Sequence, residues 1–230
     1  MSESQMLVFD IETNGLLHDV SEVHCLAIYD AQKEETFVFN NQPSNTYPIT
    51  EGLHWLTSAD VIVGHNIIGY DIPVIEKLHK IKLTSNVIDT LVLSRLFQPV
   101  RENGHSLRTW GYRIGVHKQV QPDDFDCYTP EMLSYCRQDV LLNEQVYLKL
   151  LEEGRGFNQE SIDLETNVAK IMHEQEQTGF LFDIERASML LAKLKTRMVE
   201  VEDEVQRTFK PKWVDDKLVT PYIKKNGELS

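Results

Sequence analysis

Two carboxylates, Asp10 and Glu12, stand two residues apart in the apolar segment MLVFDIET. The segment is rich in strand formers, and residues i and i+2 of a strand point to the same face. Two carboxylates side by side on an apolar strand repel each other and are poorly solvated, so their pKa values rise unless a cation is present. The pair therefore predicts a metal site. The alternative is a pair of solvated acids at an exposed strand end.

A second pair, Tyr135 and Asp139, stands four residues apart in a segment bounded by helix signals. Thr129 is a favoured N-cap residue, proline follows it at the first helical position, and Gly154 is a favoured helix end. We therefore predict a long helix here, with Tyr135 and Asp139 on one face. Taken alone, the pair would also fit a half-buried tyrosine beside a surface aspartate.

A third group, His65-Asn66 and Tyr70-Asp71, lies where a predicted strand leads into a predicted helix. Ligand-binding and catalytic groups are concentrated in such loops. The alternative interpretation is ordinary loop polarity, with Asp71 as the helix N-cap.

The elements that position these groups follow from the hydrophobic pattern. Polar, turn-forming stretches separate three strand-like segments, which predicts an antiparallel meander of Met6–Thr13, Glu22–Tyr29 and Thr36–Phe39. Two further strands are expected at Val61–His65 and at the start of Val87–Leu96, where the chain runs on into a helix.

Helices dominate the rest of the chain. The period changes at Asp71, after which Ile72, Ile75, Leu78 and Leu83 fit one helix face. The other helices are expected at Glu51–Ser58, Leu107–Ile114, Thr129–Glu153, Ile162–Thr178 and, capped by Asp183, Ile184–Phe209. Strands followed by helices indicate an α/β layered domain and then a helical segment.

The composition excludes several classes of protein. The 230 residues are 41% hydrophobic and 26% charged, as in a globular protein, and no run approaches the ~18 apolar residues of a membrane span. The polar start lacks the regions of a signal peptide. The three cysteines, Cys25, Cys127 and Cys136, have no zinc-binding spacing, so we expect reduced thiols in a cytosol-like compartment. The net charge of −13 argues against a protein that coats phosphates, unless its carboxylates hold metals.

Together the three groups resemble a known family. The three groups resemble the three motifs of the DEDD family of 3′→5′ exonucleases. These motifs are DxE on the first strand, then N-x-x-x-Y-D, then Y-x-x-x-D on a late helix. The subclass with a histidine places it five residues before the last aspartate, where this chain has Ser134, so the sequence favours the tyrosine subclass.

Longer segments resemble one branch of that family. Five segments are similar to the proofreading region of the family A DNA polymerases of short-tailed bacteriophages. They are FDIETNGLL, GHNIIGYDIPVIEKL, VIDTLVLSRL, GHSLRTWGYRIG and PDDFDCYTPEMLSYCRQDV. The resemblance extends over residues 6–212. It implies a ribonuclease-H-like fold with a mixed central sheet, and an enzyme of the infected bacterial cytoplasm.

The resemblance also assigns roles. Asp10 would bridge two Mg²⁺ or Mn²⁺ ions, Glu12 and Asp139 would complete the water-activating site, and Asp71 would hold the second ion. Tyr135 would orient the attacking water. The residues expected to bind the DNA 3′ end are Thr13, His65, Asn66, Tyr70 and His105. Asp89 is expected to cap the helix that follows it rather than to bind metal.

The fingers and palm motifs of family A polymerases are absent from the 230 residues. We therefore expect an exonuclease domain at residues 1–180, the base of a thumb at 181–230, and no polymerase activity from this chain alone. Asn226-Gly227 predicts a hairpin turn with too few residues after it, so the chain is expected to be the front part of a longer or split polymerase. The alternatives are a free-standing exoribonuclease of the same superfamily and a non-catalytic subunit of a split polymerase.

Overall fold

The computed structural model describes residues 4–43, 47–116, 122 and 124–210. The Asn226-Gly227 turn lies outside these residues. The chain divides into two compact units, residues 1–178 and 179–230.

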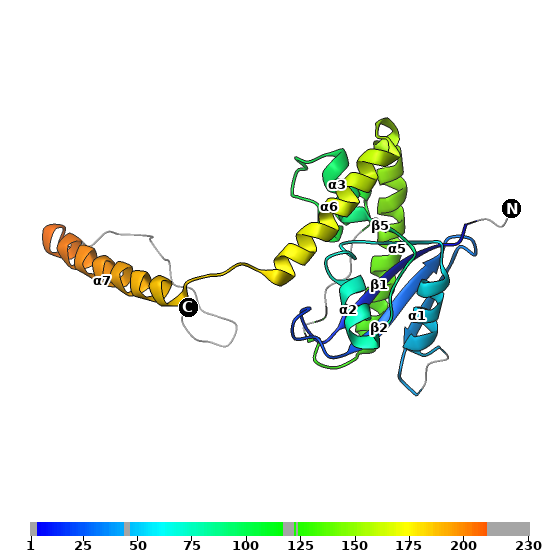
Figure 1. Cartoon of the computed structure of the whole chain (residues 1–230), viewed down its shortest axis with the longest axis horizontal. Coiled ribbons are helices and arrows are strands. Elements are labelled where there is room, and N and C mark those ends of the chain that lie inside the picture. The colour runs from blue at the N-terminus through cyan, green and yellow to red at the C-terminus, as the bar shows by residue number, and fades with distance from the viewer. Residues whose placement is uncertain (1–3, 44–46, 117–121, 123, 211–230) are drawn as a thin grey trace, which may run out of the picture. The chain divides into compact units, whose positions relative to one another are not determined.

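The first unit is built on a five-stranded mixed sheet (Figure 1). The strand order is β3-β2-β1-β4-β5. The strands are β1 (Met6–Thr13), β2 (Val23–Asp30), β3 (Glu35–Asn40), β4 (Val61–Gly64) and β5 (Asn86–Asp89). The first three form the predicted antiparallel meander, and β4 and β5 add to the β1 edge in parallel.

Helices flank this sheet (Figure 1). They are α1 (Ile49–Ser58), α2 (Asp71–His79), α3 (Thr90–Phe97), α4 (Leu107–Ile114), α5 (Pro130–Glu153) and α6 (Gln159–Thr178), with a short 3₁₀ turn at Gly154–Gly156. The second unit contributes α7 (Ile184–Thr208), whose N-cap is Asp183. The predicted α/β class and every predicted helix are confirmed.

Alternation along β1 divides the core into two layers. Leu7, Phe9 and Ile11 pack on the face covered by α1 and α2, whereas Val8 packs on the opposite face with residues of α3, α4 and α5. Because side chains alternate along a strand, Asp10 shares the face of Val8. The acidic pair of β1 is therefore on the side of the sheet where α5 packs.

One local prediction and one alternative interpretation need correction. Helix α2 ends at His79 because Lys80 takes a left-handed conformation (φ 56°), so Leu83 lies beyond the helix. The N-cap position of α2 is Tyr70, and Asp71 is the first helical residue. Gly154 ends α5 as predicted, with a right-handed φ of −76°. A Cβ there would lie 2.6 Å from the Phe97 ring, so the position needs glycine for close packing.

Candidate active site

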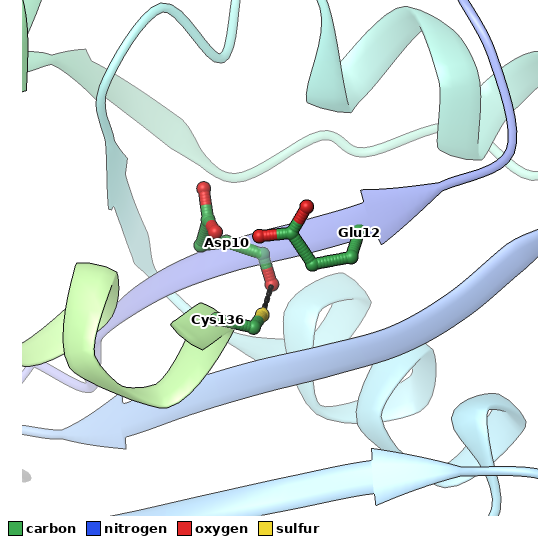
Figure 2. A group of neighbouring side chains, drawn as sticks. All are labelled: Asp10, Glu12 and Cys136. Atoms are coloured by element: carbon green, nitrogen blue, oxygen red, sulfur yellow. Dashed lines mark hydrogen bonds between the residues drawn. The ribbon is translucent and has the colours of Figure 1, made fainter. Parts of the chain in front are cut away.

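The acidic pair of β1 lies against α5 (Figure 2). Ligand atoms of Asp10, Glu12 and Cys136 all lie within 4.8 Å of one another. The Cys136 thiol donates a hydrogen bond to the backbone carbonyl of Asp10 at 3.3 Å. Burial is the main reason why the pKa of this thiol is raised well above its usual value, so it is a neutral donor at pH 7. Cys136 thus fixes α5 against the strand that carries both carboxylates.

One cavity of about 440 Å³ gathers the groups that are far apart in sequence. It brings together all five predicted catalytic residues, Asp10, Glu12, Asp71, Tyr135 and Asp139. It also includes four of the five predicted substrate-binding residues, Thr13, His65, Asn66 and Tyr70. These cavity-lining residues therefore come from four parts of the chain: strand β1, the loop before α2, the start of α2 and one face of α5.

Asp71, the first residue of α2, is one of the buried carboxylates that line this cavity. The residue is 5% exposed, and its Oδ1 accepts a hydrogen bond from the Ile11 backbone N–H at 3.3 Å. Burial raises the pKa of Asp71 to about 7, and repulsion from Asp89 adds to the rise. Burial therefore disfavours the ionised form of Asp71, and a nearby cation would favour it.

Asp89, the last residue of β5, holds the loop that follows β4 by hydrogen bonds. The Asp89 carboxylate accepts hydrogen bonds from the backbone N–H groups of Asn66 (2.8 Å) and Ile68 (3.0 Å). It also caps α3 through the Leu91 N–H at 2.9 Å, which confirms the predicted cap. Its second role, fixing the loop that brings Asn66 to the cavity, was not predicted.

His65, in the loop after β4, is positioned by Thr90, the first residue of α3. Its Nδ1 lies 2.9 Å from Thr90 Oγ1, and that hydroxyl donates to Asn143 Oδ1 of α5 at 2.7 Å. A buried chain of polar contacts thus links α5 to the residue that lines the cavity. On another side of the cavity the Tyr70 and Thr13 hydroxyls contact each other, and both lie within hydrogen-bond distance of the Gly15 carbonyl.

We expect Gly64→Ala to disturb this loop. A Cβ at Gly64 would lie 2.1 Å from Cγ2 of the fully buried Ile67, so the side chain or the loop must move. Overpacking of this kind destabilises a protein by roughly 1–3 kcal/mol. Urea denaturation of both proteins measures the effect. Gly156→Ala is the control, because no atom lies within 4 Å of its Cβ position. Equal loss of stability in the two variants would contradict the packing argument.

His105 is not part of this cavity. Its Nδ1 lies 2.9 Å from Ser94 Oγ and its Nε2 lies 3.3 Å from the Pro99 carbonyl. Ser94 also accepts a hydrogen bond from the buried Trp110 indole, at 3.1 Å. His105 therefore joins the loop before α4 to α3, and its contact with substrate stays a prediction.

Sequence reasoning missed other residues that line the cavity. Asn14, Gly15 and Leu16 directly follow the acidic pair, so their nearness along the chain was an available signal. Phe125 comes from the segment before α5, and its carbonyl lies 2.8 Å from His24 Nε2. No spacing pattern connects Phe125 with the acidic residues.

The comparisons with known proteins agree with this architecture. Residues 7–111 match the family model of the RNase H superfamily. The chain is 29% identical to the DNA-directed DNA polymerases of Escherichia phage T7 and Enterobacteria phage T3, over 89% of its own length and 37% of theirs. The chain therefore spans little more than a third of these curated relatives.

Solved structures share the fold. Brucella melitensis NrnC bound to pGG superposes with a TM-score of 0.59 at 17% identity, covering 79% of this chain and 90% of NrnC. NrnC has also been solved with bound Mg²⁺ (TM-score 0.58, 16% identity, 77% and 87% coverage). Escherichia coli RNase D, an exoribonuclease, gives 0.56 at 14% identity, with 74% and 45% coverage. The predicted ribonuclease-H-like fold is confirmed. No helix within the described part of the chain could cross a membrane.

Proposed function

We propose that this chain is a metal-dependent 3′→5′ exonuclease that acts on DNA, the proofreading part of a phage-type family A DNA polymerase. The observation that supports this most strongly is the convergence of four carboxylates and Tyr135 in one cavity on a ribonuclease-H-like fold. The similarity to the phage polymerases over most of the chain favours DNA as the substrate. The enzyme would work in the cytoplasm of the infected bacterium.

The donor set fits divalent cations. Asp10, Glu12, Asp71 and Asp139 supply oxygen ligands, which Mg²⁺ and Mn²⁺ prefer. The raised pKa of the buried Asp71 indicates a site that favours a nearby cation. Two such ions would stabilise the charge that develops on the attacking and leaving oxygens of an in-line displacement.

The chain's own residues would then orient the reactants. The proposed reaction forms a bond from water oxygen to the terminal phosphorus and breaks the bond to the 3′ oxygen, so a nucleoside 5′-monophosphate leaves. A tyrosine phenol ordinarily keeps its proton at pH 7, so the hydroxyl of Tyr135, which is 7% exposed, suits a water-orienting hydrogen bond better than proton abstraction. His65, Asn66, Thr13 and Tyr70 line the space in which the terminal nucleotide would lie.

Tyr135→Phe is expected to lower kcat by about tenfold or more and to leave KM nearly unchanged. The lost hydrogen bond to the water contributes about 1–1.5 kcal/mol, which corresponds to roughly a factor of ten. Steady-state digestion of a single-stranded oligonucleotide measures both constants. Tyr147→Phe is the matched control, a buried tyrosine of the same helix that does not line the cavity. A fall in kcat that is the same in both variants would argue against the assigned role.

The two structural units agree with two functional regions in the chain. We assign the exonuclease to residues 1–180 and the beginning of the polymerase region to residues 181–230, of which the structure describes the part up to 210. The polymerase portion, in the same or a separate chain, would be the partner that presents a frayed primer end. A frayed end is expected to select mismatches, because an unpaired terminus is already free to leave the duplex.

A second candidate function is RNA trimming, because E. coli RNase D, an exoribonuclease, shares this fold. Single strands of DNA and RNA with the same sequence and a 5′ label separate the two. We expect faster shortening of the DNA strand. Faster shortening of the RNA strand would support the exoribonuclease instead, and no shortening of either strand would support a non-catalytic subunit.

A further inference from the structure

Another cavity, of about 360 Å³, lies within the unit of residues 1–178. It is bounded by strand β5 and by helices α3, α5 and α6. Its walls are largely apolar and are formed by Val87, Ile88, Leu93, Phe97, Leu151 and Ile162. No described residue lines both this cavity and the one around Asp10. A volume of roughly 300–1,000 Å³ with apolar walls and a few polar groups is typical of a small-molecule site.

Tyr147 of α5 brings an unpaired hydroxyl to this cavity. The residue is only 8% exposed, and its hydroxyl has no hydrogen-bond partner within the described part of the chain. Burial raises the pKa of Tyr147 above its usual value, so the phenol keeps its proton and can donate. Because a buried tyrosine hydroxyl normally has a partner, the cavity calls for a ligand that carries a hydrogen-bond acceptor.

Helix α6 contributes polar groups to the same cavity. Asp163, Asn167 and Lys170 recur at steps of four and three residues, so they share one face of the helix. The Asp163 carboxylate accepts a hydrogen bond from Gln159 at 2.8 Å, which leaves it further lone pairs. The side chains of Asn167 and Lys170 have no hydrogen-bond or ion-pair partner among the residues that the structure describes. Asp163 and Lys170 are about 10 Å apart along the helix axis.

The chemistry of these groups indicates which ligand fits. The apolar walls favour a planar ring, and the side-chain amide of Asn167 offers a donor and an acceptor to the polar edge of that ring. The Asp163 carboxylate can accept hydrogen bonds from an amino group, and the Lys170 ammonium can bind a phosphate. The ligand should therefore carry an amino-bearing ring at one end and a phosphate at the other, which describes a nucleoside monophosphate.

We propose that this cavity binds a nucleoside 5′-monophosphate whose base carries an amino group. The base would lie between the apolar walls, within reach of Asp163 and Tyr147, and the phosphate would contact the exposed Lys170. Of the four common deoxynucleotides, dGMP is expected to bind most tightly, because guanine offers two adjacent N–H donors to one carboxylate. The binding needs no metal and does not require the proposed exonuclease, although molecules of this class are products of that reaction.

Isothermal titration of the full 230-residue chain with dGMP, in the presence of chelator, tests the site. We expect a dissociation constant below about 1 mM, and Tyr147→Phe should raise it about fivefold through the loss of one hydrogen bond. Tyr135→Phe is the matched control, because Tyr135 lines the acidic cavity instead, and it should leave the constant within about twofold. No binding by the wild type, or weakening by Tyr135→Phe that equals or exceeds that by Tyr147→Phe, would overturn the proposal.

Ligands that lack one group provide a second test, which is independent of any change in the core. Deoxyguanosine, without the phosphate, should bind the wild type at least about threefold more weakly than dGMP. Lys170→Ala should weaken the binding of dGMP and leave that of deoxyguanosine nearly unchanged, whereas the control Lys82→Ala, at an exposed lysine outside the cavity, should affect neither. TMP, whose base has no amino group, should bind more weakly than dGMP. Equal affinities for dGMP, deoxyguanosine and TMP, or equal effects of the two lysine variants, would contradict the proposed site.

Discussion

Asp10→Asn is expected to reduce kcat/KM for shortening of a DNA 3′ end by at least about a thousandfold, or roughly 4 kcal/mol of transition-state stabilisation. Asp10 shares the acidic face of β1 with Glu12 and lines the cavity with the other three residues proposed to hold metal. Replacing its carboxylate by an amide removes charge with little change in volume. Quantitative digestion of a 5′-labelled oligonucleotide at saturating Mn²⁺ measures the loss.

The control for this variant is Asp19→Asn. The Asp19 side chain is 75% exposed and does not line the cavity, so the same chemical change there should leave kcat/KM within about twofold. Thermal unfolding of Asp10→Asn should show a folded protein. Activity in Asp10→Asn similar to that of the wild type would mean that the metal site has been assigned to the wrong residues.

The stability of the metal-free protein is expected to fall as the pH rises towards neutrality. The pKa of Asp71 is raised from its ordinary value of 3.8 to about 7 by burial, so the folded state binds this proton more tightly than the unfolded state does. The stabilisation is complete below the unfolded pKa and is lost as the pH rises through about 7. A shift of this size corresponds to a few kcal/mol, and Asp89, whose pKa burial also raises, acts in the same direction.

Divalent metal should reverse this trend. Mn²⁺ competes with the proton on Asp71, so its apparent affinity should rise about tenfold per pH unit below pH 7 and level off above it. Thermal unfolding in chelator and in Mn²⁺, at pH 5.5 and pH 8, measures both effects. Asp71→Asn should be more stable than wild type at pH 8 without metal and should show a smaller dependence on pH. A metal-free wild type that is more stable at pH 8 than at pH 5.5 would contradict the assignment.

The strands and helices were largely predictable because their signals are local. The apolar, strand-forming composition of Met6–Thr13 and the flanking turns determine the meander, and Thr129 with Pro130 determines the start of α5. Leu83 was misassigned because its apolar side chain fits the helical period, whereas the chain ends α2 with a left-handed Lys80 that carries no strong signal in sequence. Apolar spacing alone does not locate such an ending.

Part of the candidate site was predictable because two of its residue pairs are close in sequence. Asp10 with Glu12, and Tyr135 with Asp139, share a face by strand and helix geometry, so each pair could be recognised locally. The resemblance to the exonuclease motifs brought the pairs together, and their common cavity agrees with it. His105 and Phe125 could not be placed, because each lies in a loop whose course no local pattern in the sequence determines.

The most direct test of the central proposal is digestion of a 5′-labelled DNA primer with a mismatched 3′ end, with Mg²⁺ or Mn²⁺ and with chelator. We predict a ladder of progressively shorter strands that all keep the 5′ label, formed only when metal is present. Release of the label as a mononucleotide, shortening in chelator, or an intact primer with both metals would contradict a metal-dependent 3′→5′ exonuclease.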